Sequence, residues 1–185
     1  MKHVFLGILF IFINLGLHAQ GRNQGIKIGA KAGANFSNFS DAANNENKTG
    51  LLTGAFIKGF INNKIAIQVE ALFSKEGAKL NNQKLNIDYI RFPVLVKYYL
   101  LKGINIQGGP QFGFVVNDNI TKVLGSLFEV EDIDITGNIG IGIDLPFDLS
   151  IDVRYNFGLS DVVKNGNVGK NQVFSVTLAC AFLNK

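Results

Sequence analysis

The chain has 185 residues, of which 47% are apolar, with a formal net charge of +4 and 21 glycines against 3 prolines. This length suits one ordinary domain, and the apolar fraction is that of a globular protein rather than a helical membrane protein. No run of five or more basic residues occurs, so the sequence lacks the clustered charge that binds nucleic acid. The single cysteine, Cys180, excludes an intramolecular disulfide and a cysteine-based metal site.

The N-terminal segment has the organisation of a secretory signal peptide. Residues 1–3 form a short basic start, residues 4–17 are almost entirely apolar, and a small residue then precedes a polar one at Ala19-Gln20. The apolar stretch is shorter than the roughly 20 residues that a spanning helix needs. We therefore predict cleavage near Ala19-Gln20, with a signal peptide over 1–19 and one mature domain over 20–185. An uncleaved N-terminal membrane anchor is the alternative.

Alternation of apolar and polar residues dominates the remainder of the chain. Over 148–157, every second residue from Leu149 onward is apolar and the residues between them are polar. A period of two predicts β-strands with one apolar and one polar face. No second apolar stretch is as long as the roughly 18 residues of a spanning helix, which excludes a helical membrane protein. The strand pattern occurs in these segments: 26–36, 49–60, 65–77, 85–99, 104–115, 132–144, 148–158 and 171–182.

The connections between these segments alternate in length. Short turns at one end and long loops at the other are typical of outer-membrane barrels, whose turns face the periplasm. Backbone polar groups must be paired within the protein in hydrocarbon, so a spanning sheet has to close on itself. We therefore predict an all-β fold, an eight-stranded antiparallel up-and-down transmembrane β-barrel. The expected tight turns are 62–63, 101–103 and 146–147, and the expected long loops are 37–48, 78–84, 116–131 and 159–170.

The interior of such a barrel is only wide enough for side chains to fill it. With the apolar faces turned outward, charged residues of both signs point inward, where an unpaired charge costs several kcal/mol. We therefore expect a salt-bridged interior in which Glu70 and Asp152 neutralise Arg91, Lys97 or Arg154. A gated polar path or a ligand pocket is the alternative. Three glutamines complete the expected interior set: Gln68, Gln107 and Gln111.

The sequence offers little for catalysis. Both histidines, His3 and His18, fall within the predicted signal peptide, so the mature chain would hold no Ser-His-Asp or Cys-His arrangement. We therefore expect no enzymatic activity, no catalytic residue and no cofactor. Carboxylates cluster near the end of one predicted loop, at Glu129, Glu131 and Asp132. Such clusters can bind divalent cations, but we expect solvated loop residues there and no metal site.

Several motifs follow one another in the order of a known family. They are K-A-G-A-N-F-S over 31–37, the glutamate-bearing stretch 68–77, D-Y-I-R-F-P-V-L-V-K-Y over 88–98, G-G-P-Q-F-G over 108–113 and D-V-R-Y-N-F-G-L-S-D over 152–161. In these residues the sequence resembles the PorT-like family of outer-membrane β-barrel proteins. Arg91 departs from the family pattern, in which an acidic residue is commoner at that position.

The resemblance implies a barrel in the cell outer membrane, surrounded by lipid and placed there by the barrel-insertion machinery. The name-giving members are associated with protein secretion and gliding, which implies an envelope or secretion partner. A soluble periplasmic barrel of the lipocalin type, binding a small apolar ligand, is the alternative. It would turn its apolar face inward, whereas a membrane barrel turns that face to lipid. The resemblance and the alternating loop lengths favour the membrane barrel, with a structural or partner-docking role.

Overall fold

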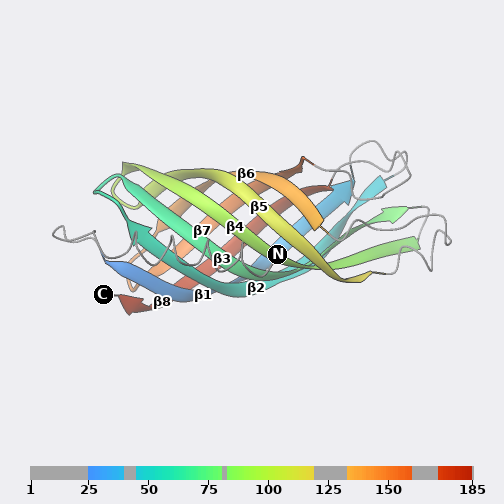
Figure 1. The fold of residues 1–185 in the computed structure, drawn as a ribbon, viewed down its shortest axis with the longest axis horizontal. Helices are drawn as coiled ribbons and strands as arrows, with labels where there is room; N and C mark the ends of the chain where they lie inside the picture. Colours follow the sequence, from blue (N-terminus) through green and yellow to red (C-terminus); the bar gives the residue numbers. More distant parts are fainter. Residues whose placement is uncertain (1–24, 40–44, 81–82, 119–132, 160–170, 185) are drawn as a thin grey trace, which may run out of the picture.

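A computed structural model of the chain describes residues 25–39, 45–80, 83–118, 133–159 and 171–184. In that part of the chain, antiparallel strands follow one another around a closed barrel, and the last pairs with the first (Figure 1). The predicted eight-stranded barrel is therefore confirmed. No described helix is long and apolar enough to cross a membrane. The strands are β1 (Ile26–Phe39), β2 (Asn45–Phe60), β3 (Ile65–Leu80), β4 (Gln83–Leu101), β5 (Ile104–Asp118), β6 (Ile133–Asp144), β7 (Leu149–Gly158) and β8 (Asn171–Asn184).

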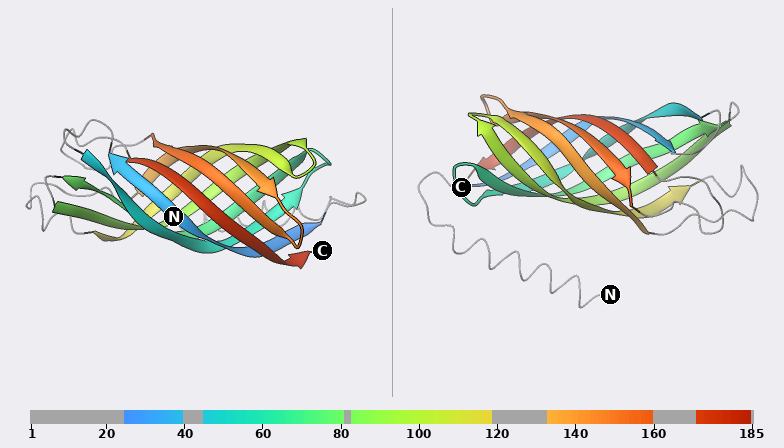
Figure 2. Two further views of the ribbon diagram at one scale, coloured as in Figure 1. Left: turned by 180° about the vertical axis from the view of Figure 1, so that it is seen from behind. Right: turned by 90° about the horizontal axis from the view of Figure 1, so that it is seen from above.

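The short connections lie together at one end of the barrel, which we call the turn end; the opposite end is the loop end (Figures 1 and 2). They link β2 to β3, β4 to β5 and β6 to β7, and the C-terminal end of β8 lies beside them. In the first, the side-chain oxygen of Asn62 accepts hydrogen bonds from the backbone N–H groups of Lys64 and Ile65, at 2.8 and 2.9 Å. Such an Asx turn reverses the chain in few residues.

The predicted long loop over 78–84 is wrong. β3 continues to Leu80 and β4 starts at Gln83, with Leu80 paired to Gln83 and Lys79 to Lys84. The sequence there is mostly polar, and a strand that projects beyond the bilayer has water on its outer face, so it needs no apolar alternation. The periodicity that predicted the other strands is therefore absent where this hairpin leaves the membrane. For the same reason β2 begins at Asn45, inside the predicted loop 37–48.

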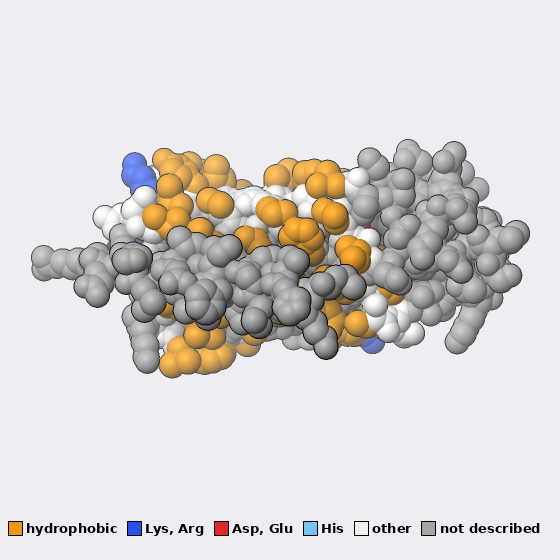
Figure 3. All heavy atoms as spheres, viewed as in Figure 1, with side chains coloured by type: hydrophobic (Ala, Val, Ile, Leu, Met, Phe, Trp, Pro, Cys, Tyr) orange, Lys and Arg blue, Asp and Glu red, His pale blue; other side chains and the backbone are white. Residues whose placement is uncertain are grey.

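Alternate residues of the strands face outward and inward. The outward positions are apolar over most of the barrel, and Figure 3 shows apolar side chains spread along its wall, with Lys and Arg side chains near its two ends. The inward positions are mostly polar or charged and are buried. An exposed apolar wall around a polar interior is the arrangement of a membrane barrel. Outward apolar residues include Ile57, Val96, Ile106, Phe112, Ile139, Ile141, Tyr155, Val176 and Leu178.

Candidate functional site

The middle of the interior is occupied by a cluster of five charged side chains, which we call the central cluster: Lys31, Glu70, Lys97, Asp152 and Arg154. Lys31 Nζ lies 2.8 Å from Glu70 Oε1 and 2.6 Å from Asp152 Oδ2. Lys97 Nζ lies 2.9 Å from the other oxygen of Asp152. All five side chains are buried. Three basic groups therefore share two carboxylates, and each carboxylate is bound by at least two of them.

Arg154 joins opposite walls of the barrel. Its two terminal nitrogens donate to the two oxygens of Glu70, at 2.7 and 2.6 Å, and Nη2 also lies 3.0 Å from Asp152 Oδ2. This fork geometry is the strongest form of an arginine–carboxylate pair. Neutral amides complete the cluster, since Gln68 donates to Glu70 and Gln107 Nε2 donates to Asp152 Oδ1 at 2.8 Å. Each charged group of the central cluster therefore has an oppositely charged partner, although the basic groups outnumber the carboxylates by one.

A second group of side chains lies nearer the loop end, and we call it the loop-end cluster: Tyr89, Arg91, Glu76 and Asp134. Arg91 forms ion pairs with Glu76 and, at 2.7 Å, with Asp134. Its guanidinium also stacks over the ring of Tyr89, 3.8 Å from the ring centre. A Cβ on Gly113 would lie 2.3 Å from Arg91 Nη1, so the missing side chain at Gly113 is what leaves room for the arginine.

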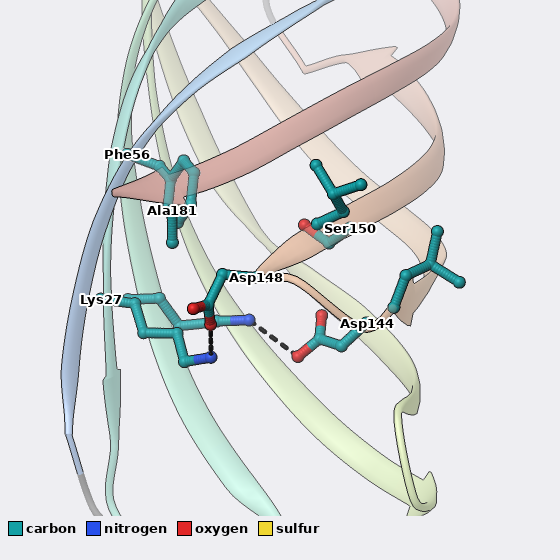
Figure 4. Close-up of a pocket in the computed structure, with 9 residues that line it drawn as sticks. Lys27, Phe56, Asp144, Asp148, Ser150 and Ala181 are labelled. Carbon is teal, nitrogen blue, oxygen red and sulfur yellow. Dashed lines mark hydrogen bonds and ion pairs between the residues drawn. The ribbon is translucent and has the colours of Figure 1, made fainter. Parts of the chain in front are cut away.

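A third set of polar contacts closes the turn end. Asp144 Oδ2 accepts hydrogen bonds from Lys58 Nζ and from the Tyr99 hydroxyl, both at 2.8 Å. Beside it, Lys27 Nζ pairs with Asp148 at 2.5 Å (Figure 4). The four charged residues of this set, Lys27, Lys58, Asp144 and Asp148, line a cavity of about 20 Å³, which has room for a single water molecule. This cavity is therefore too small for an organic ligand.

All five charged residues predicted for the interior lie inside the barrel, but they do not form one network. The structure brings together Glu70, Lys97, Asp152 and Arg154 in the central cluster. Arg91 lies apart from them, in the loop-end cluster, with carboxylates that the prediction did not include. The predicted glutamines Gln68, Gln107 and Gln111 are also buried; Gln111 donates to Thr136 at 3.0 Å.

Sequence reasoning missed three charged members of these clusters: Lys31, Glu76 and Asp134. Each falls on the inward phase of its strand's alternation; Glu76, for example, lies an even number of positions from the inward Glu70. Following the period of two through whole strands would have found all three. The predicted acidic group Glu129, Glu131 and Asp132 lies outside the described residues, as does the predicted signal peptide. Among the described residues, no group of His, Cys, Asp and Glu is arranged to hold a metal ion.

The arrangement acts chemically as a plug. Charged groups from strands on different sides of the barrel meet across its axis, so ion pairs and hydrogen bonds occupy the space that a pore would need. A lipocalin-type barrel would need an apolar interior around its ligand. The polar interior and the outward apolar wall do not favour that alternative.

Comparison with known proteins agrees with this architecture. A sequence model described as "Outer membrane protein beta-barrel domain" matches residues 18–164. No curated protein matches the sequence. Among solved structures, the fold is similar to neisserial surface protein A (NspA), with 11% identity, a TM-score of 0.54 and coverage of 85% of this chain and 97% of that one. It is also similar to Ail, the attachment invasion locus protein of Yersinia pestis, crystallised with the heparin analogue sucrose octasulfate, with 12% identity, a TM-score of 0.51 and coverage of 86% and 99%.

At these identities the similarity to NspA and Ail shows the shared fold alone. The family match covers most of the sequence, including seven of the eight strands. Together with the closed barrel and its apolar outer wall, that match establishes the family. The chain belongs to the family of outer membrane protein β-barrel domains.

Proposed function

We propose that this protein is a closed, non-enzymatic barrel that serves the outer membrane as a structural and docking element. It reaches the membrane through a signal peptide cleaved near Ala19-Gln20, and its partner is an envelope protein. The resemblance of its strand motifs to the PorT-like family supports a partner connected with protein secretion.

The central cluster is the main support for this proposal. Glu70 and Arg154 join strands β3 and β7 across the barrel, and Lys31 and Lys97 tie Asp152 to β1 and β4. Opening a path along the axis would break several buried ion pairs at once and separate charges that now compensate one another. A barrel with this interior is better suited to presenting its loop end than to passing a solute.

The interior also supports a role without catalysis. A catalytic acid, base or nucleophile has to reach a substrate, and the charged groups of the central cluster are buried and bound to one another. The loops are then the part of the protein that meets its partner, because contacts with partners are concentrated on loops that a rigid scaffold positions.

Chemical crosslinking in intact cells tests the docking role. Two forms would be compared: the natural chain, and one in which residues 160–170 are replaced by a Gly-Ser segment of equal length. We expect a discrete crosslinked species with the natural chain, lost in the loop variant, while both barrels remain folded in the outer membrane. Absence of any crosslinked species, or its persistence in the variant, would contradict docking through this loop. Mass measurement of the purified protein checks cleavage after Ala19.

Conductance in planar lipid bilayers tests separately whether the barrel interior is closed to ions. The natural barrel is expected to give no current steps above those of protein-free membranes. Regular steps from the natural chain would contradict a closed interior, whatever the crosslinking shows.

A further inference from the structure

The turn end carries an unusual set of exposed side chains. The first turn exposes Ile61 (54%) beside Lys64, and the second exposes Leu101 (67%) beside Lys102. The third exposes Phe147, whose surface is 92% accessible. Phe147 therefore lies at the tip of its turn, and Ile61 and Leu101 lie where the other two turns leave the strands; a turn in water would be more polar.

Phe147 also has an unusual backbone conformation for an exposed aromatic residue. Phe147 and Asp148 have φ angles of 63° and 56°, in the left-handed region that glycine and asparagine adopt most easily. A bulky aromatic residue in that conformation is strained and gains nothing from packing when its ring is exposed. An environment outside the chain that favours the ring would explain why it is held there.

The length of β6 shows which environment the turns meet. This strand has 12 residues, with apolar outward positions from Ile133 to Ile143, and Leu145 continues the apolar wall into the turn. At about 3.3 Å per residue and a tilt of roughly 40°, it spans about 30 Å along the barrel axis, the thickness of a bilayer's hydrocarbon core. Phe147, two residues beyond Leu145, then lies at the level of the headgroups.

The two ends of the outer wall differ in a way that supports this placement. Toward the loop end the outward side chains of β3 and β4 become polar, where Lys75 is paired in register with Asp88 and Asn117 of β5 donates to Asp88 at 3.5 Å, although Val116 beside it is apolar. At the turn end the apolar wall continues into the turns. Lys64 and Lys102 are exposed there and form no ion pair within the part of the chain that the structure describes.

We propose that the turn end is embedded in the periplasmic leaflet of the outer membrane and binds anionic phospholipid headgroups. Ile61, Leu101 and Phe147 enter the boundary between headgroups and acyl chains, and Lys64 and Lys102 contact the phosphates. A lysine near the end of an apolar segment can place its stem along the lipid and its charge among the headgroups. This inference rests on the proposed outer-membrane function, and it assigns partner proteins to the loop end.

Because the chain contains no tryptophan, a single substituted tryptophan reports its own surroundings. Phe147→Trp and Leu101→Trp would be folded separately into vesicles of phosphatidylcholine and phosphatidylglycerol that carry brominated acyl chains. Leu178→Trp, on the lipid-facing wall of β8, is the control within the hydrocarbon. If Phe147→Trp does not fold, Leu101→Trp provides the same measurement at the second turn.

We expect emission from Trp at 147 and 101 to be blue-shifted, and quenched more by bromine near the headgroup than by bromine deep in the chain. The control should show the opposite order. Red-shifted emission that acrylamide quenches and brominated lipid does not, from a barrel that still shows a heat-dependent gel shift, would overturn the inference and leave the proposed function standing. A natural chain without that gel shift would remove the proposed function and this inference together.

The lysines are tested by comparing vesicles with and without phosphatidylglycerol. We expect the urea midpoint of the natural barrel to rise when the anionic lipid is present, and the rise to be lost in the double variant Lys64→Ala, Lys102→Ala. Lys75→Ala, at the loop end, is the matched control and should keep the full rise. An equal rise in the double variant would overturn the headgroup contact.

Discussion

Arg154 donates two hydrogen bonds to the carboxylate of Glu70, at 2.7 and 2.6 Å, although the two residues lie on β7 and β3, opposite strands of the barrel. Neighbouring strands are joined by their backbones, but opposite strands can be joined only through side chains that cross the axis. The pair therefore connects opposite walls of the barrel as well as filling its interior.

Glu70→Met should destabilise the barrel by about 3–5 kcal/mol, because it leaves Arg154 and Lys31 with Asp152 as their shared carboxylate. The double variant Glu70→Met, Arg154→Met should lose less than Glu70→Met alone, since it removes one charge of each sign. Urea unfolding in lipid vesicles measures both. Equal or greater loss in the double variant would show that the pair is not coupled. Asp88→Asn, on the outer wall, is the control and should change stability by less than about 0.5 kcal/mol.

Gly113→Ala should weaken the loop-end cluster, because its Cβ would lie 2.3 Å from Arg91 Nη1 and force the guanidinium away from Asp134. We expect a loss of about 1–3 kcal/mol, measured by the same unfolding assay. Gly59→Ala is a matched control, since a Cβ there meets nothing within 4 Å. Similar stabilities for the two variants would contradict the close packing of Arg91 against β5.

A lysine substituted on the outer wall should destabilise the barrel more, the deeper it lies in the bilayer. Ile139→Lys, near the middle of the apolar wall, should lose about 2–4 kcal/mol of stability in vesicles, and Val116→Lys, at the loop end, about 0–1 kcal/mol. Both side chains are exposed, so the difference measures lipid rather than packing. If the two variants were equally stable, the wall would not face hydrocarbon.

Asp148→Asn should have a small effect, although Lys27 and Asp148 approach to 2.5 Å. Their side chains are 25% and 38% exposed, and an ion pair so accessible to water contributes about 0–1 kcal/mol. Asparagine also accepts the left-handed backbone at this position, so the substitution tests the charge alone. A loss of stability as large as that of Glu70→Met would mean that the turn end is as inaccessible to water as the central cluster.

The barrel could be predicted from the sequence because outward residues face lipid and inward residues face the polar interior. Alternate residues of a strand therefore differ in polarity. Leu149 to Phe157 shows this directly, since its polar members Asp152 and Arg154 face the interior while Ile151 and Tyr155 face outward. The hairpin at 78–84 was missed because a strand outside the bilayer has no such constraint.

The pairing of the interior charges was harder to predict. Arg91 could have met Glu70 as well as Glu76 by sequence alone; register and tilt decide which carboxylate lies within reach. Lys31 was missed although it alternates with Ala30 and Ala32, because small apolar residues mark a strand face weakly. Contacts across the axis join residues far apart in the chain, such as Glu70 and Arg154, and no local pattern records them.

The most direct test of the membrane barrel is cell fractionation followed by electrophoresis of unheated and boiled samples in detergent. We expect recovery in the outer membrane and faster migration of the unheated protein, because the closed barrel stays compact until heat unfolds it. Recovery in the soluble periplasm, with no difference between unheated and boiled samples, would contradict the membrane barrel.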